Sequence, residues 1–418
     1  MAEPTYFGAH LAQGAPHHPA GPVAIVGGGL VGMVLALALK HQGIAAVLHD
    51  ARPRGAARSD PRVLALSHGS QQILTRLGLW PHIAAAATPI TTIHVSQRGR
   101  FGRTRMTAQE QNVPALGQVT AAGHIAAALD DALAAAGIEY HDHAHIDHVN
   151  TTKEQACLHR ADDTHSTAPL VIYAEGATKA ANATDATNAT VARLAAEVRD
   201  HDYDQHALIC QVTTTTPHGH VAHERFTPDG PLALLPFDQA SAGNGYSMVY
   251  TCAPEEAQRL AALDEAAFLK ALQAHFGSTR LCFATASPRH VFPLGLRYRS
   301  APVAPRCVWL GNAAQTLHPV AGQGFNLALR DVMALVHVLA QDDARQDPGN
   351  PQVLARYAAS RRHDRLGMIG ITHGLVRLFS NDLPILRETR GLALLALDLS
   401  PTLRSLLAQH MMYGARSR

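Results

Sequence analysis

Near its N-terminus the chain carries two apolar runs separated by a segment of strong helix formers. The runs are residues 23–26 and 44–48, and the segment between them, residues 33–40, ends shortly before Gly43. Short apolar runs are typical of strands that are buried on both faces of a parallel sheet. Glycine directly after a helical segment is a common helix end. The pattern therefore predicts a strand–helix–strand unit with a parallel sheet.

The rest of the chain predicts both helices and strands. Helices are expected at residues 121–136 and 263–275, and residues 205–290 otherwise show the alternating or β-rich pattern of a sheet. Apolar runs at residues 170–174 and 307–310 predict further strands, and the second of them is followed by a helix. The chain then ends in helices.

This order predicts an α/β protein with a Rossmann-like nucleotide-binding domain, an interleaved β-sheet domain and C-terminal helices. Because the sheet domain interrupts the nucleotide-binding domain, a ligand pocket is expected between them. The expected boundaries are residues 1–20 for a flexible N-terminal extension; 21–85, 119–200 and 290–350 for the nucleotide-binding domain; 86–118 and 201–289 for the substrate-binding sheet domain; and 351–418 for the C-terminal helical region.

A glycine-rich turn follows the first predicted strand. Gly27, Gly29 and Gly32 have the G-x-G-x-x-G spacing: the first permits a tight turn, the second lets the backbone approach a pyrophosphate, and the third lets helix and strand pack closely. The helix N-terminus favours the anion through its unpaired N–H groups and its dipole. Asp50 ends the second strand, where an acceptor for a ribose hydroxyl belongs. These features predict a dinucleotide site.

A second glycine-rich turn lies far along the chain, at residues 311–326. It follows a short apolar strand, and its Gly322 and Gly324 lead into a helix. A nucleotide tail alone would not need this second element. Two such turns indicate a long cofactor that is held at both ends, which favours FAD over NAD.

At this point the chain resembles a known family, the class A flavoprotein monooxygenases, and within it the ubiquinone-biosynthesis hydroxylases. The likeness covers roughly residues 22 to 410. Within the family, the chain is similar in particular to the 2-polyprenyl-6-methoxyphenol hydroxylases. The likeness implies a fold like that of p-hydroxybenzoate hydroxylase, in which the Rossmann-like domain binds FAD. The stretches that carry it are residues 62–67, 90–96, 115–119, 224–236 and, most strongly, 311–331.

The resemblance also implies roles for individual residues. Pyrophosphate would lie at Gly27, Gly29 and Gly32, and the adenosine ribose at Asp50. Arg62 and Gln118 would also contact the cofactor. The alternative role of Arg62 is a surface salt bridge, and that of Gln118 is a buried amide whose hydrogen bonds are made by the backbone. The remaining cofactor contacts implied are Asn312 at the ribityl chain, and Gly322, Gly324 and Asn326 at the flavin ring.

The chemistry that the resemblance implies is aromatic hydroxylation. NAD(P)H reduces FAD, and a flavin C4a-hydroperoxide passes one oxygen atom from O2 to an electron-rich ring, here that of a prenylated phenol. His318, in the second glycine-rich segment, is the single candidate near the reacting centre; a loop-fixing hydrogen bond is its alternative role. Two other functions stay open: a hydroxylase of a soluble aromatic compound, and a non-catalytic flavin-bound member of a quinone-biosynthesis complex.

The chain departs from the family pattern at three places. Glu175 stands before Gly176 where relatives have Asp, which bears on NAD(P)H engagement, and a low-complexity stretch follows at residues 180–190. Asn312 replaces the usual Asp, although it can still hydrogen-bond a hydroxyl. His373 stands where relatives commonly have Asp, with no role assigned to it.

Composition narrows the class of protein. The net charge of +2 comes without a basic tract and gives no sign of nucleic-acid binding. No apolar run reaches the length of a transmembrane helix, and residues 1–20 lack the pattern of a signal or transit peptide. The five scattered cysteines, without a C-x-x-C, fit a reducing compartment. We therefore expect a cytoplasmic protein.

Two further patterns concern metals and membranes. The 27 histidines are mostly dispersed, and the denser group at His141, His143 and His145 favours a solvated face, so no metal is expected. Apolar segments near the C-terminus are punctuated by Arg377, with further arginines beyond it. Such stripes predict core helices, or a surface helix that touches the inner face of the membrane or a protein of a quinone-biosynthesis complex.

Overall fold

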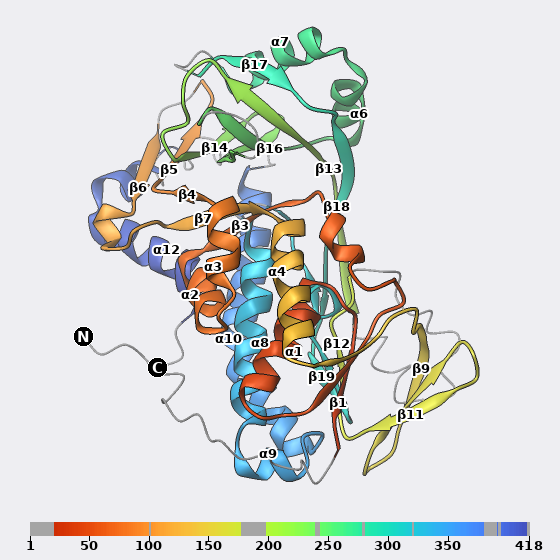
Figure 1. The fold of residues 1–418 in the computed structure, drawn as a ribbon. Coiled ribbons are helices and arrows are strands. Elements are labelled where there is room, and N and C mark those ends of the chain that lie inside the picture. The colour runs from red at the N-terminus through yellow and green to blue at the C-terminus, as the bar shows by residue number, and fades with distance from the viewer. Residues whose placement is uncertain are drawn as a thin grey trace.

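A computed structural model describes residues 21–415 apart from 100–101, 177–197, 239–242, 278–280, 320–321, 380–390 and 392–393. The expected N-terminal extension and the low-complexity stretch at 180–190 lie outside the described residues. None of the described helices is both long and apolar enough to cross a membrane. Figure 1 shows a lower α/β body, an upper sheet region and a small projecting sheet.

The body is built on a largely parallel sheet that runs in the order β19-β20-β12-β1-β2-β8. Its central strand β1 is apolar and buried throughout, and the residues of β2, β12 and β20 are buried or half-buried, as expected of a parallel sheet covered on both faces. The strands are β1 (Val23–Val26), β2 (Ala46–His49), β8 (Glu139–His141), β12 (Val171–Tyr173), β19 (Val303–Ala304) and β20 (Cys307–Trp309).

Helices α1, α4 and α8 pack together and bury the main hydrophobic core against this sheet. The structure thus confirms the predicted strand–helix–strand start and the helices near residues 121–136 and after the second glycine turn. Short helices complete the body. The bounds are α1 (Leu30–His41), α2 (His68–Arg76), α3 (Trp80–Ile83), α4 (Ala122–Ala135), α8 (Gln323–Leu339) and α9 (Asp342–Gln346).

The upper region is a large mixed sheet in the order β21-β18-β13-β16-β15-β14-β5-β6, with β17 paired to β13. Helices α6 (Pro254–Ala262) and α7 (Glu265–Phe276) cover one face and form a second core with it. The strands are β5 (Thr92–Gln97), β6 (Arg103–Thr107), β13 (Val198–Thr214), β14 (Val221–Thr227), β15 (Gly230–Pro236), β16 (Gly245–Cys252), β17 (Phe283–Ala286), β18 (His290–Arg299) and β21 (Gln315–Thr316).

The large sheet reaches further along the chain than the sequence indicates. The predicted boundary of the sheet domain is residue 289, yet β18 pairs with β13 as far as Arg299. Its last residues also pair with β21, inside the second glycine-rich segment. The long paired strands β13 and β18 therefore connect the two regions directly (Figure 1).

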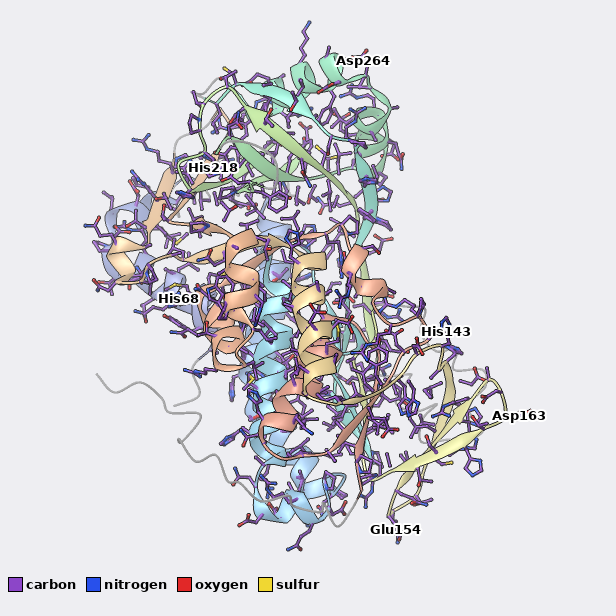
Figure 2. The ribbon with its side chains drawn as sticks, in the orientation of Figure 1. His68, His143, Glu154, Asp163, His218 and Asp264 are labelled. Atoms are coloured by element: carbon purple, nitrogen blue, oxygen red, sulfur yellow. The ribbon has the colours of Figure 1, made fainter. Side chains whose placement is uncertain are left out.

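Two small antiparallel sheets complete the strands. One, of β3 (Val63–Ser67), β7 (Gly117–Ala121) and β4 (Thr88–Ile90), lies between the body and the large sheet. The other, of β9 (Ile146–Thr151), β10 (Ala156–Arg160) and β11 (His165–Ala168), projects from the body, with the labelled Glu154 and Asp163 at its ends (Figure 2).

The C-terminal helices are joined to the body by a buried polar network. Helix α10 (Pro351–Phe379) packs on α8, and α12 (Pro401–Tyr413) packs on α2, β3 and β6. Arg361 of α10 bridges Asp331 of α8 and Asp364, and Gln315 donates to Asp331 at 2.7 Å. Burial by itself lowers the pKa of Arg361, but the carboxylates of Asp331 and Asp364 raise it by more, so the net shift is upward. The buried charges are therefore compensated.

Candidate active site

The carboxyl ends of four neighbouring parallel strands bring the predicted site segments together. His49, Val26, Tyr173 and Trp309 lie in one register row across β2, β1, β12 and β20. The residues that follow them are Asp50, the first glycine turn, Glu175 and the second glycine-rich segment. In open α/β sheets, ligands bind at this edge.

The first turn needs its glycines for close approach and for backbone conformation. Gly27 has φ of +113°, and a Cβ there would lie 2.7 Å from the nitrogen of Glu175. A Cβ at Gly32 would lie 1.9 Å from the carbonyl oxygen of Gly27, so this glycine lets α1 approach β1. A Cβ at Gly29 would meet no described atom within 4 Å. The strand and helix thus pack closely while the turn stays open on the side of Gly29.

Asp50 is held against this turn. Its side chain is buried, and one carboxylate oxygen accepts a hydrogen bond from the backbone nitrogen of Gly28 at 2.8 Å. Arg52 donates to the same carboxylate from its backbone and its guanidinium. Tyr140 borders the same small cavity, and burial raises the pKa of its hydroxyl to about 12. This cavity, which polar and apolar side chains line together, lies where an adenosine ribose is expected.

Sequence reasoning missed three residues of this cavity. A Cβ at Gly28 would lie 2.1 Å from the hydroxyl of Tyr140 and 2.6 Å from the carboxylate of Asp50, so a side chain at Gly28 would clash with the residues that line the cavity. Gly28 falls between the motif glycines, and Tyr140 and Arg52 belong to no motif. Their position depends on the pairing of β2 with β8 and on the turn after β2.

The helices that open at the two glycine turns both begin at a glycine. Within the described residues, no side chain caps α1 at Gly29 or α8 at Gly322, a lack of a cap that they share with α3, α4, α6 and α9. Ser67, Asp264 and Ser400 cap α2, α7 and α12 with side-chain oxygens. An N-terminus without a side-chain cap keeps its N–H groups available to an anion or to a polarised oxygen.

Asn326 holds the start of α8 on β3. Its side-chain oxygen accepts from the nitrogen of Ser67 at 2.8 Å, and its side-chain nitrogen donates to the carbonyls of Ala65 and Gly322, each at 2.9 Å. Gly322 is left-handed, with φ of +59°, and packs close to Ala65. The side-chain amide is therefore bonded to backbone groups. Asn326 thereby shapes the loop that leads into α8 at Gly322, which we call the flavin-side loop because the sequence associates it with the flavin.

The other predicted contacts lie around this loop and β3. Asn312 is exposed, and a Cβ at Gly324 would meet no described atom within 4 Å. Gln118 of β7 reaches Gln71 at 3.4 Å. Arg62, at the start of β3, has an exposed side chain and forms a bidentate ion pair with Asp60.

His318 lies buried in an aromatic cluster that joins three distant segments. Its ring meets that of Tyr203 of β13 edge-on, with centroids 5.4 Å apart. The hydroxyl of Tyr203 lies 3.0 Å from Nδ1 of His373 on α10. Burial lowers the pKa of His318 to about 4, so the ring is neutral at physiological pH. His373, to which the sequence assigned no role, thus belongs to this cluster.

Glu175 follows β12 directly beside Gly27. Its carboxyl is partly buried, and burial raises its pKa above the usual range, while Asp50 adds to the effect. The residue therefore lies close to the first glycine turn, next to the predicted pyrophosphate position.

The histidine-rich segment carries no metal cluster in the part of the chain that the structure describes. His141 pairs with Glu139 at 2.7 Å, and His145 lies 3.4 Å from Asp147. Among the described residues, no three or more His, Cys, Asp and Glu side chains are grouped so that they could hold a metal ion. His143 lies at the base of the projecting sheet (Figure 2).

Comparison with known proteins places these features in a family. The family model described as an FAD binding domain matches residues 21–366. Ubiquinone hydroxylase UbiL of Rhodospirillum rubrum is 32% identical over 99% of this chain and 96% of its own length. The 3-demethoxyubiquinol 3-hydroxylase of Escherichia coli is 31% identical over 91% of this chain and 96% of its own length.

Solved structures share the fold. The p-nitrophenol 4-monooxygenase PnpA of Pseudomonas putida superimposes with a TM-score of 0.72 over 96% of this chain and 99% of that chain, at 14% sequence identity. At this identity the match concerns the fold alone, and it is the fold that the sequence predicted.

Proposed function

Because this chain belongs to the FAD-binding-domain family, and within it to the ubiquinone hydroxylases that match it over nearly their whole length, we propose that it hydroxylates the ring of a polyprenylated phenol in ubiquinone biosynthesis. The protein is an FAD-dependent aromatic hydroxylase, with NAD(P)H as its electron donor and O2 as its oxidant. The observation that carries the proposal is the pair of glycine turns that open helices α1 and α8 beside one sheet edge.

The residues of the two turns fit FAD. Gly29 leaves room for a pyrophosphate, and the N–H groups at the start of α1 would bind the anion. The carboxylate of Asp50, held by Gly28 and Arg52, would accept a hydrogen bond from a ribose hydroxyl. Glu175 lies beside the same turn. Within this proposal Gly27, Gly29, Gly32 and Asp50 hold the adenosine end, with Arg62 and Gln118 as further contacts to the cofactor.

The second turn would hold the other end. Asn312 is exposed and able to bond a ribityl hydroxyl, while Gly322 and Gly324 let the backbone approach the ring system. Asn326 positions that backbone through β3. The bound flavin supplies the activation of O2, and the protein binds the phenol, orients its ring and excludes water. His318 is neutral and buried beside this loop, where it would shape the reacting centre.

A polyprenyl substrate also bears on where the protein works. We place it in the cytoplasm, at the inner face of the membrane or in a complex of quinone-biosynthesis proteins. Helix α12 and the residue before its cap present three exposed leucines, Leu399, Leu403 and Leu406, and β6 beside it exposes Arg103 and Arg105. Apolar side chains flanked by basic ones suit an anionic lipid surface.

The test is direct. Purified protein should carry FAD and oxidise NADPH or NADH faster when a prenylated methoxyphenol is added, and mass spectrometry should find a product with one more oxygen. In cells that lack the chain, the same phenol should accumulate and quinone should be lost. Stimulation by soluble phenols alone would instead identify a hydroxylase of soluble aromatic compounds, and flavin binding without any stimulated oxidation would identify a non-catalytic component.

Gly29→Asp provides the control for catalysis. Its carboxylate would press against the pyrophosphate, so the variant should purify without flavin and fail to restore quinone in the deletion strain. The narrower identification as a 2-polyprenyl-6-methoxyphenol hydroxylase would follow from the ring position of the added oxygen. Restoration of quinone by this variant would indicate that flavin chemistry is not the function of the chain.

A further inference from the structure

Glu224 is the single acidic residue in a row of apolar side chains across the large sheet. Backbone pairing places it beside Val95 of β5 and Ala233 of β15, and the row continues through Val249 of β16 and Ile209 of β13. Residues in one register row point to the same face of a sheet. The face therefore presents a carboxyl in the middle of an apolar wall.

The two faces of this sheet differ in how completely they are filled. On the face covered by α6 and α7, Leu232 and Leu234 of β15 are fully buried. On the opposite face Glu224, Ala233 and Val249 all stay partly accessible, although they lie in central strands. On the same face of β14, Ala222 and Phe226 are buried, so on this strand the partial accessibility of the face is confined to Glu224.

This face is directed at the cofactor side of the protein. Ala222 and Leu235, on the same face as Glu224, pack against Val119 of β7 and Ile90 of β4. The neighbouring Val95 packs with residues of α12. Figure 1 shows the sheet of β3, β4 and β7 lying between the large sheet and α8. Because Asn326 ties β3 to the start of α8, the face that carries Glu224 is connected to the flavin-side loop through the sheet of β3, β4 and β7.

Within the described parts of the chain, the charged neighbours of Glu224 do not neutralise it. His223 and Arg225 alternate to the other face of β14, where they contact Phe276, and Arg105 of β6 lies in the row of His94 on that face. Across the sheet, α12 contributes Arg404, which pairs with Glu110. Burial raises the pKa of Glu224 to about 7. A carboxyl in this state exchanges a proton near neutral pH.

We propose that Glu224 is the group that recognises the hydroxyl of the phenol substrate and accepts its proton, a role that rests on the proposed function. An apolar wall with one placed acid suits a ring that is apolar except for its hydroxyl. The phenol O–H bond breaks and a carboxyl O–H bond forms, which leaves a phenolate and a neutral Glu224. The phenolate is more electron-rich, so its ring is more reactive toward an electrophilic oxygen.

The first test compares a prenylated methoxyphenol with its methyl ether, which lacks the hydroxyl proton. In the unchanged protein, kcat/KM should favour the phenol, and Glu224→Leu should reduce that preference by roughly 10- to 100-fold, the range of a hydrogen bond to a charged group. Glu255→Gln, an exposed glutamate on α6, is the matched control and should leave the preference unchanged. Equal preference in the unchanged protein and Glu224→Leu would overturn the proposal.

The second test keeps the size of the side chain. The kcat/KM for the phenol should rise with pH through about 7 in the unchanged protein, because the carboxylate is the active form. Glu224→Gln should lose this limb while it keeps its flavin spectrum, which shows that the fold and FAD binding are intact. A limb that persists unchanged in Glu224→Gln overturns the role of Glu224.

Failure of the inference and failure of the proposed function give different results. If the unchanged protein and both Glu224 variants hydroxylate the phenol alike, only the role of Glu224 is wrong. If the unchanged protein hydroxylates no prenylated phenol, and the flavin spectrum does not change when the phenol is added, both proposals fail.

Discussion

The hydroxyl of Tyr203 lies 3.0 Å from Nδ1 of His373, and this contact joins the large sheet to the long C-terminal helix. The ring of Tyr203 in turn meets that of His318, in the segment that precedes α8. His201 packs edge-on against both Tyr203 and His373. The histidine at position 373 therefore anchors Tyr203 beside the flavin-side loop.

Loss of this anchor should loosen the loop. In His373→Ala, Tyr203 loses its hydrogen bond, and we expect FAD to bind roughly 2- to 10-fold more weakly, the range for one neutral hydrogen bond. Flavin fluorescence titration measures the change. His363→Ala, an exposed position on the same helix, is the control and should bind FAD normally. Unchanged FAD affinity in His373→Ala would show that Tyr203 is held without this contact.

The first glycine turn allows a paired test of fold against cofactor binding. A Cβ at Gly29 meets no described atom within 4 Å, so Gly29→Ala should keep the free energy of unfolding of the flavin-free protein within about 0.5 kcal/mol. Its methyl group would crowd the pyrophosphate, so FAD affinity should fall at least roughly tenfold. Gly28→Ala clashes with Tyr140 and Asp50 and should destabilise the flavin-free protein as well, by about 1–3 kcal/mol.

Chemical denaturation and flavin titration of the two variants give both quantities. If Gly29→Ala retained FAD as well as the unchanged protein, the pyrophosphate would have to lie elsewhere. If Gly28→Ala were as stable as Gly29→Ala, the contacts around Tyr140 would not be tight in solution.

Two asparagines of the second turn should behave differently. Asn326→Ala leaves the buried nitrogen of Ser67 and two carbonyls without their partner, which should cost about 1–3 kcal/mol of stability even without flavin. Asn312 is exposed, so Asn312→Ala should change stability by no more than about 0.5 kcal/mol and weaken only FAD binding. Thermal unfolding with and without FAD separates the two effects. Equal loss of stability in both variants would contradict the structural role of Asn326.

Acidification should reveal the buried neutral state of His318. Burial lowers its pKa to about 4, whereas the unfolded chain titrates near 6.5, so between these values the unfolded state binds more protons. The contribution of His318 to stability is therefore complete above about pH 6.5 and is lost as the pH falls toward 4. His49 and His223 share the same direction, and Glu224, with its raised pKa, opposes it.

Because several groups titrate in this range, the measurement compares the pH dependence of stability in the unchanged protein with that in a variant of His318. Denaturation of the unchanged protein and of His318→Gln at several pH values between 4 and 7 should show a shallower loss of stability on acidification in the variant. Parallel curves would indicate that the pKa of His318 is the same in the folded and the unfolded protein.

Local pattern was sufficient for a large part of this architecture. Residues 23–48 form a strand, helix and strand because their apolar runs and glycines favour those conformations whatever surrounds them. The same holds for the helices near residues 122–135 and 265–276 and for the second glycine turn. These segments also carry the spacing of a dinucleotide turn, so the choice of cofactor was accessible from the sequence.

The exact end of the large sheet was not accessible in the same way. β18 extends to Arg299 because β13 runs alongside it, and the pairing partner of a strand leaves no local mark on its residues.

The sequence by itself determined the elements, their order and the glycine turns, because each depends on residues that are close along the chain. Only the tertiary structure decided which side chains meet. Asn326 bonds Ser67 across 259 residues, Tyr203 meets His373 across 170, and the register of five strands places Glu224 in an apolar wall. Such contacts depend on how whole elements pack, and packing favours particular partners only once the sheets and helices are assembled.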